Sequence, residues 1–264
     1  SIASSPGLRQ NRLEDGEETM GCRFVLAMVM FGVLGGAGAA SGAEAPVHDP
    51  LWGKALATAA KNRTWRPRRV LEDEKLIDRK GGRLARRTES VHEIFRDAEG
   101  RYQGRLLSAT RGGEDVTEIR RKELAQRPQR EFFKPENDVF SPQWNATHTA
   151  TRTDLRETID GRPCVGFQYT MEARDATWVG VAFLDEETGV PRRITVVPDR
   201  FPVNEKVKIR NMTMELSFAE DATRWFLVRM EISTNIEATI SLFFTWKGRS
   251  EVSLKFEDWR DVAE

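Results

Sequence analysis

The sequence is poor in the residue types on which most small enzymes and metalloproteins depend. Among its 264 residues are only two cysteines and three histidines, His48, His92 and His148. These residues provide no disulfide framework and no zinc-binding spacing. A glycine-rich phosphate loop and a G-x-S-x-G nucleophile motif are also missing. We therefore expect no enzymatic activity, no metal and no cofactor. The alternative is a hydrolase, which would need His92 or His148 beside a serine and a carboxylate.

The chain also lacks an excess of charge of either sign. Its 41 basic and 41 acidic side chains give a formal net charge of zero, so no global field attracts nucleic acid. With 39% hydrophobic and 31% charged residues, the composition is neither that of a membrane protein nor that of a disordered chain. We expect a folded protein with no nucleic-acid partner.

Long hydrophobic runs are missing as well, and the longest, Phe24 to Leu34, is too short to cross a bilayer as a helix. It follows Arg23 and leads into small residues that end at Ala43, which is the pattern of a secretory signal peptide. A buried core helix is the alternative. We expect cleavage after Ala43 and a periplasmic protein. The chain then divides into an over-called or non-native extension (residues 1–19), a signal peptide (residues 20–43) and one domain (residues 44–264).

Two segments have the pattern of a helix. Leu51 to Lys61 places apolar residues on one side, and Asp115 to Arg127 begins at a capping residue and is followed by Pro128. The second segment is locally basic through Arg120, Arg121 and Lys122. We expect this basic run to be a solvated face, with an anion-binding site as the alternative.

The rest of the chain predicts long antiparallel strands. Between residues 236 and 246 the even positions are apolar, which is the period of a strand with one buried face. A change of parity predicts a bulge near Arg210. Long, twisted strands of this kind curl. The predicted fold is mainly β, an antiparallel meander curled into an open half-barrel with two or three helices or lid segments on its concave side. Turn residues predict hairpins at Gly81-Gly82, residues 97–100, Asp160-Gly161, residues 186–189, Asp221-Ala222 and Lys247-Gly248.

The inner wall of such a trough would gather large, adaptable apolar side chains, which suit a hydrophobic ligand. That these side chains only fill a core is the alternative. A proline-broken aromatic segment, residues 131–144, is a candidate flap with the lid residues Phe132, Phe133, Phe140 and Trp144. The predicted ligand-binding residues are Val165, Phe167, Tyr169, Met171, Phe183, Met212, Met214, Leu216, Phe226, Val228, Met230, Leu242 and Phe244.

The C-terminal half resembles a known family. The segment from Ile159 to Tyr169, the turn Leu184-Asp-Glu-Glu-Thr-Gly-Val-Pro191 and the paired long strands after it are similar to the periplasmic outer-membrane lipoprotein-sorting proteins, the LolA-like family. The resemblance covers roughly residues 146–259. It implies an open half-barrel with helices in its concave side and acyl chains in the pocket between them. The highly charged region from Arg66 to Arg130 departs from the family pattern.

The resemblance, the leader and the strand pattern together predict a periplasmic carrier of an acyl chain, lipid or acylated lipoprotein in envelope trafficking. Such a protein would be peripheral to the membrane at most. The alternative is a non-catalytic envelope interaction module whose sheet edge pairs with a protein partner by strand addition.

Overall fold

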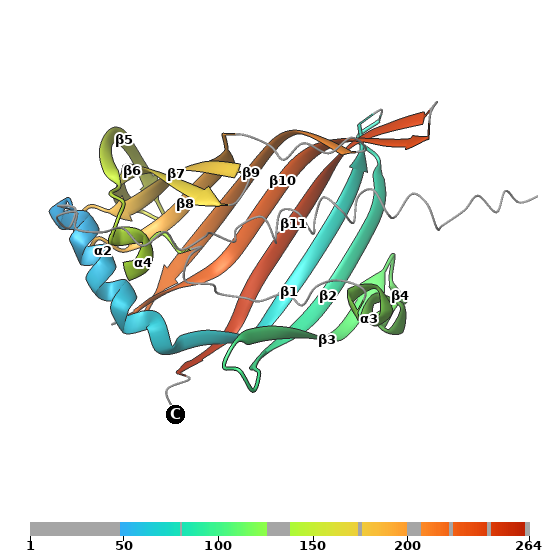
Figure 1. Cartoon of the computed structure of the whole chain (residues 1–264), viewed down its shortest axis with the longest axis horizontal. Coiled ribbons are helices and arrows are strands. Elements are labelled where there is room, and N and C mark those ends of the chain that lie inside the picture. Colours follow the sequence, from blue (N-terminus) through green and yellow to red (C-terminus); the bar gives the residue numbers. More distant parts are fainter. Residues whose placement is uncertain are drawn as a thin grey trace, which may run out of the picture.

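The computed structural model describes residues 48–79, 81–125, 138–173, 176–199, 207–221, 224–241 and 244–261. The predicted signal peptide, Phe132, Phe133 and Leu242 lie outside these residues. The described chain forms one antiparallel sheet of eleven strands that does not close, with a few short helices (Figure 1). The predicted fold class is thereby confirmed. Within these same residues, no helix is both long enough and apolar enough to cross a membrane.

The strands follow the chain as a meander, with one exception in the middle of the sheet. The order across the sheet is β4-β3-β2-β1-β11-β10-β9-β8-β7-β6-β5. The helices are α2 (Pro50–Lys61), η1 (Asn62–Thr64), α3 (Thr117–Ala125) and α4 (Pro142–Asn145). The strands are β1 (Trp65–Asp78), β2 (Leu84–Arg96), β3 (Tyr102–Arg111), β4 (Glu114–Asp115), β5 (Thr151–Ile159), β6 (Arg162–Ala173), β7 (Ala176–Asp185), β8 (Pro191–Pro198), β9 (Val207–Glu220), β10 (Trp225–Ser241) and β11 (Phe244–Asp261).

The first and last strands of the sequence lie side by side in the centre of the sheet. β1 pairs with β11 from Trp65 opposite Asp261 to Asp78 opposite Gly248. The two edges therefore come from the middle of the sequence, β5 on one side and β3 with β4 on the other. This pairing joins the charged N-terminal strands and the apolar C-terminal strands into one surface.

Most of the predicted punctuation is confirmed. Asp160 and Gly161 both have positive φ, 50° and 76°, as a two-residue hairpin turn of the I′ type requires. Pro191 begins β8 and Pro198 ends it. The register of β9 against β10 shifts so that Arg210 has no partner, which is the predicted bulge.

The last hairpin lies elsewhere than predicted. The chain reverses between Ser241 and Phe244, so residues 236–246 belong to two strands. Most paired residues of β10 and β11 are an even number of positions apart in the sequence. The even-numbered residues of both strands therefore lie on the same face, and the apolar alternation continues across the reversal. Lys247-Gly248 lies inside β11, and the predicted turn there is wrong. A Cβ on Gly248 would lie 2.1 Å from the ring of Trp246, so this glycine marks a close approach.

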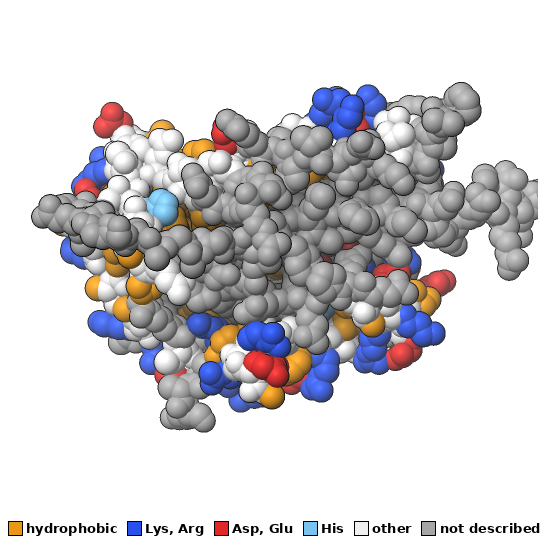
Figure 2. Space-filling view, viewed as in Figure 1, with side chains coloured by type: hydrophobic (Ala, Val, Ile, Leu, Met, Phe, Trp, Pro, Cys, Tyr) orange, Lys and Arg blue, Asp and Glu red, His pale blue; other side chains and the backbone are white. Residues whose placement is uncertain are grey.

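The helices lie at two separate places on one face of the sheet (Figure 1). α2 and α4 cover β6 and β7, whereas α3 lies at the other side against β3. The side chain of Asp49 accepts a hydrogen bond from the Leu51 amide at 2.8 Å and caps α2, and Pro50 occupies its first turn. On this face, hydrophobic side chains gather over α2, and lysine and arginine side chains gather along the rim that holds β3 and α3 (Figure 2).

Candidate functional site

One end of this face is filled by aromatic side chains. The ring of Trp52 is fully buried, with its centroid 5.0 Å from that of Phe140 and 5.5 Å from that of Phe167. The Trp52 Nε1–H donates a hydrogen bond of 2.9 Å to the Asn145 side chain. This packing joins α2, the lid segment and β6. We call this group the aromatic plug: Trp52, Phe140, Trp144, Phe167 and Tyr169.

Tyr169 anchors the plug to the sheet. Its ring meets Trp144 edge-on at 5.9 Å and lies over Gly180, where an added Cβ would be 2.2 Å from it. Burial raises the pKa of the Tyr169 hydroxyl, which therefore stays protonated. The Tyr169 side chain therefore adds no charge to the aromatic plug.

Several predicted ligand-binding residues belong to this filled end. Val165, Phe167, Tyr169 and Met171 are buried, as are the described lid residues Phe140 and Trp144. Phe183 is buried too, but it lies outside this core cluster, with the guanidinium of Arg193 4.8 Å from its ring centroid.

A bulge in β10 changes the predicted alignment of that strand. Its register against β9 shifts between Leu227 and Arg229, leaving Val228 without a partner. Trp225 and Leu227 therefore join the core cluster in place of Phe226 and Val228. Phe226 instead packs against Trp259, with ring centroids 5.5 Å apart. The bulge has no turn residue to mark it, so alternation alone misassigned the two positions.

The middle of the face is an apolar surface on three adjacent strands. Leu216 pairs with Met230 and Met230 with Leu254, while Met214 pairs with Ile232 and Ile232 with Val252. Ile232, Val252 and Leu254 are buried, and the other three are partly exposed. Met212 is buried one row further on. The side chain of Phe244 is outside the described part. We call the following group the apolar floor: Met214, Leu216, Met230, Ile232, Val252 and Leu254.

On β1 and β2 the same face becomes polar. Glu72 lies opposite Leu254 and Glu74 opposite Val252, so carboxylates continue the two apolar rows. The structure thus brings together a group that sequence reasoning missed. One signal in the sequence could have revealed this group. Glu72 and Glu74 are charged residues at alternate positions of a strand whose pattern is otherwise that of a half-buried strand. We call this group the polar wall: Glu72, Glu74, Arg86, Ser90, His92, Arg111, Arg120 and Glu123.

Ion pairs connect the wall to α3. Glu74 lies 3.2 Å from Arg86 and 3.3 Å from Arg120, and Arg120 is also 3.4 Å from Glu123. Burial alone would lower the pKa of Arg120, but the attraction of Glu74 and the neighbouring carboxylates outweighs it and raises that pKa. Arg120 is 4% exposed, so the prediction of a solvated basic face is wrong for this residue.

The wall also contains the residue types of the hydrolase alternative. His92 Nε2 lies 3.0 Å from the Glu72 carboxylate, and both side chains are buried. Ser90 pairs with Glu72 across the strands and precedes His92 by two positions on the same face. The Ser90 hydroxyl makes no hydrogen bond to His92. These three side chains therefore lie near one another without the serine–histidine hydrogen bond of an activated nucleophile.

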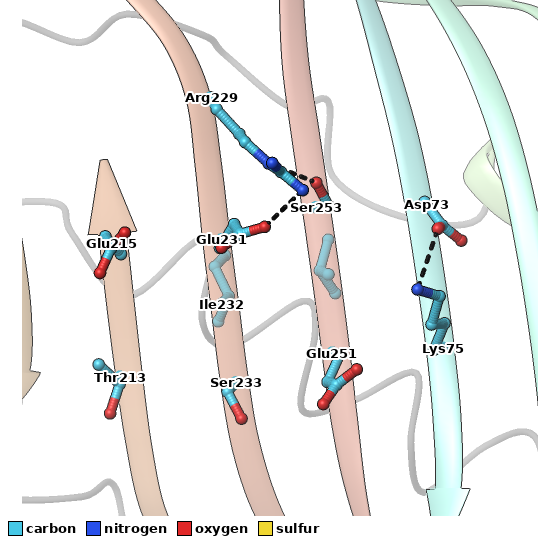
Figure 3. A pocket seen from close by; sticks show the side chains of 11 residues that line it. Asp73, Lys75, Thr213, Glu215, Arg229, Glu231, Ile232, Ser233, Glu251 and Ser253 are labelled. Atoms are coloured by element: carbon cyan, nitrogen blue, oxygen red, sulfur yellow. Dashed lines mark hydrogen bonds and ion pairs between the residues drawn. The ribbon is translucent and has the colours of Figure 1, made fainter. Parts of the chain in front are cut away.

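The opposite face of the sheet holds a hollow of about 380 Å³ (Figure 3). Its side chains are charged, with Arg229 2.7 Å from Glu231 and Lys75 3.4 Å from Asp73. Ile232 and Val252, two buried members of the apolar floor, border the hollow from the other side of the sheet. Among the residues that the structure describes, neither this hollow nor any other place groups three or more side chains fit to hold a metal ion.

The two sheet edges differ in their cover. At the β3 edge the Val116 amide donates to the Ala109 carbonyl at 2.9 Å, and Arg121 donates to the Leu107 carbonyl at 3.3 Å. The β5 edge has no such cover among the described helices, and its register against β6 shifts between Arg152 and Arg156. Bulges of this kind blunt an open edge without closing it.

Comparison with known proteins adds one structural similarity. No model of a protein family matches the sequence, and no curated protein matches it. Neither search supports the LolA-like family specifically, and that resemblance stays a prediction. Among solved structures, the chain is similar to a DUF1329 family protein from Desulfovibrio piger ATCC 29098. The TM-score is 0.36 and the sequence identity 9%, over 80% of this chain and 91% of that chain.

Proposed function

We propose that the protein is a periplasmic carrier that binds an acyl chain or a similar hydrophobic group on the apolar floor. One observation carries the proposal. Met214, Leu216 and Met230 keep part of their surface exposed between two helical covers, α2 on β7 and α3 on β3. Flexible, partly exposed methionines adapt to irregular apolar ligands. The cargo class, a lipid or an acylated lipoprotein, follows the expectation from sequence.

The burial of apolar surface would supply the affinity. Each CH₂ group removed from water contributes about 0.8 kcal/mol, so a 14-carbon chain would gain on the order of 10 kcal/mol before the costs of ordering. Micromolar binding needs about 8 kcal/mol, so part of the chain is enough. The aromatic plug offers no comparable opening, because Trp52 and Phe167 are 0% exposed.

A titration with an acyl chain that carries an environment-sensitive fluorophore tests the proposal. We expect saturable binding to the purified, delipidated protein and displacement by an unlabelled chain. Met214→Trp should weaken binding at least tenfold, because the larger ring would fill the floor. The matched control is Thr213→Trp, an adjacent residue on the opposite face, which should bind as the natural protein does. Non-saturable binding to the natural protein would reject the proposal.

A second candidate function is supported by the open edge of β5. An envelope protein could add a strand there, since Leu155 is 50% exposed and the β3 edge is already covered. Crosslinking in the native envelope would test it with Leu155→Lys, because a charged side chain on an edge strand opposes the addition of another strand. Loss of a crosslinked partner with intact binding of the acyl probe would favour the interaction module over the carrier.

A further inference from the structure

We propose that the polar wall binds the head of the ligand, and that this head is an uncharged hydrogen-bonding group such as a hydroxyl, ester or amide. The inference rests on the proposed function, because the tail must lie on the apolar floor. It adds a site on β1, β2, β3 and α3 and a chemical class for the head. The argument has three parts: the position of the wall, its charge and its unused hydrogen-bonding groups.

The wall lies where a chain on the floor would end. Leu254 is the strand partner of Glu72, and Val252 is the partner of Glu74. Directly opposed residues on one face have Cβ atoms roughly 5 Å apart, so the change from apolar to polar takes place within one strand spacing. α3 stands behind this boundary, with Arg120 3.3 Å from Glu74. An amphiphile on the floor would therefore meet the wall with its polar end.

The formal charges of the wall cancel when His92 is neutral. Among the described residues its carboxylates and guanidiniums are equal in number. Arg120 pairs with Glu74 and Arg111 with Glu123 at 3.7 Å, while Glu72 contacts His92. A charged head would add an uncompensated charge to a buried, balanced cluster, which is costly. An uncharged head would not. The charged members are Glu72, Glu74, Glu123, Arg86, Arg111 and Arg120.

Hydrogen-bonding capacity is left over inside this balanced cluster. Among the described residues, the Ser90 hydroxyl and the Arg120 Nε–H find no hydrogen-bond partner, although Ser90 and Arg120 are only 3% and 4% exposed. Buried polar groups in folded proteins are nearly always hydrogen-bonded. Both of these groups can donate, so they call for an acceptor oxygen. A hydroxyl, ester or amide oxygen supplies it without adding charge.

Three competitors with the same saturated chain test the head preference: a fatty alcohol, a fatty acid and an alkylamine. Each displaces the fluorescent acyl probe at pH 8, below its micelle concentration. We expect the alcohol to bind about tenfold more tightly than either charged competitor, because only the charged heads unbalance the wall. Ser90→Ala should weaken the alcohol several-fold.

Charge-changing variants then shift the preference. Glu74→Gln leaves the wall with one extra positive charge, so the fatty acid should gain about tenfold relative to the alcohol. Arg120→Gln should favour the alkylamine by a similar factor. Glu251→Gln changes the charge of the opposite face and should alter neither ratio. If Glu74→Gln does not fold by circular dichroism, Glu123→Gln makes the same change of charge at a more exposed carboxylate.

The outcomes separate the two proposals. If all three competitors bind equally, or if the charge variants leave the ratios unchanged, the proposal that the polar wall binds the head is wrong. The proposal that the apolar floor binds the tail is then unaffected. Tighter binding of the fatty acid or the alkylamine by the natural protein also overturns the head site. If no competitor displaces the probe, or the probe itself does not saturate, the carrier function fails.

Discussion

The aromatic plug and the polar wall lie on the same face of one sheet. The plug is buried, and so is the centre of the wall (Glu72, Glu74, Ser90, His92 and Arg120), but different forces hold them. In the plug, rings pack within 5.0 to 6.4 Å of Trp52, and a single hydrogen bond orients that residue. In the wall, carboxylates and guanidiniums pair across β1, β2 and α3. Buried rings contribute stability directly, whereas buried ion pairs contribute little beyond an equivalent apolar packing.

This difference indicates that the two regions of the sheet have different roles. A structure selected only for stability would continue the apolar rows of the floor across β1. Glu72 and Glu74 interrupt those rows, and their burial needs α3 and its Arg120 to balance the charge. Groups that are costly to bury and add little to stability are candidates for binding. The plug therefore holds the fold, and the wall is the region to examine for recognition.

The largest expected effect is the loss of the plug. Trp52→Ala should lower the free energy of unfolding by about 3–5 kcal/mol, because it leaves a large cavity among Phe140, Trp144 and Phe167. Urea denaturation followed by circular dichroism measures it. Trp52→Phe is the control, since it keeps one aromatic ring and loses the hydrogen bond to Asn145 and the second ring of the indole, at a smaller cost of about 1–3 kcal/mol. Equal effects of the two variants would mean that ring packing does not hold this end.

The wall should respond differently to single and paired changes. Glu74→Ala removes the carboxylate that pairs with both Arg86 and Arg120, leaves Glu123 as the remaining partner of the buried Arg120, and should cost about 3 kcal/mol. Replacing both partners, as in Glu74→Leu with Arg120→Met, should restore most of that loss, because two apolar side chains need no balancing charge. The same denaturation experiment checks this. A double variant as unstable as the single one would show that the ion pair itself stabilises the fold.

Acid should act on the plugged end through Asp185. Burial alone would raise its pKa, but the amides of Thr188 and Glu187 donate to the carboxylate at 2.9 and 3.0 Å and, with Arg192, lower that pKa. A folded-state pKa below the unfolded value of about 3.9 gives stability that is present above that pH. This stability is lost as the pH falls through the folded pKa.

Asp185→Asn tests this linkage. It should cost about 1–3 kcal/mol at pH 7 and flatten the loss of stability below pH 4, which denaturation at pH 7, 5, 4 and 3 would show. At the far end of β10, Arg210 and Lys247 lower the pKa of Glu237 to about 2. Glu237→Gln therefore serves as a control, because it removes another carboxylate with a lowered pKa that lies outside the aromatic plug. An unchanged acid profile in Asp185→Asn would contradict the assignment.

The smallest expected effect is a gain. Gly53 lies inside α2, and an added Cβ would meet nothing within 4 Å. Gly53→Ala should raise the free energy of unfolding by about 0.5–1 kcal/mol, because alanine restricts the unfolded chain. Thermal denaturation measures the gain. A decrease would mean that α2 needs the flexibility of glycine at this point, and that the plug is less rigid than its packing suggests.

Sequence patterns predicted most of the strands and turns because these depend on neighbours in the chain. The Asp160-Gly161 turn needs positive φ at both positions, which these residue types tolerate. Pro191 has no backbone N–H to donate inside a sheet, so it marks the start of a strand. Both signals can be recognised in the sequence. The bulge at Val228 and the reversal after Ser241 were missed. Neither has a turn signal, and the alternation of apolar residues does not report on them.

The polar wall could not be predicted, because its members come from four elements, β1, β2, β3 and α3, that only the sheet brings together. Glu74 and Arg120 are far apart in the sequence, and each belongs to a charged stretch typical of a solvated surface. The apolar members of the floor on β9 and β10 were predicted from alternation. Their neighbours on β11, Val252 and Leu254, were not among the predicted ligand-binding residues.

The sequence by itself determined the class of the fold, since period-two alternation and local turn chemistry act over a few residues. It also determined that long strands would form one face rich in methionine and aromatic side chains. Only the tertiary structure decided that β1 lies beside β11, because strand pairing over such a separation depends on the closure of the whole sheet. That pairing places Glu72 and Glu74 against Leu254 and Val252, and makes a polar boundary out of two unrelated segments.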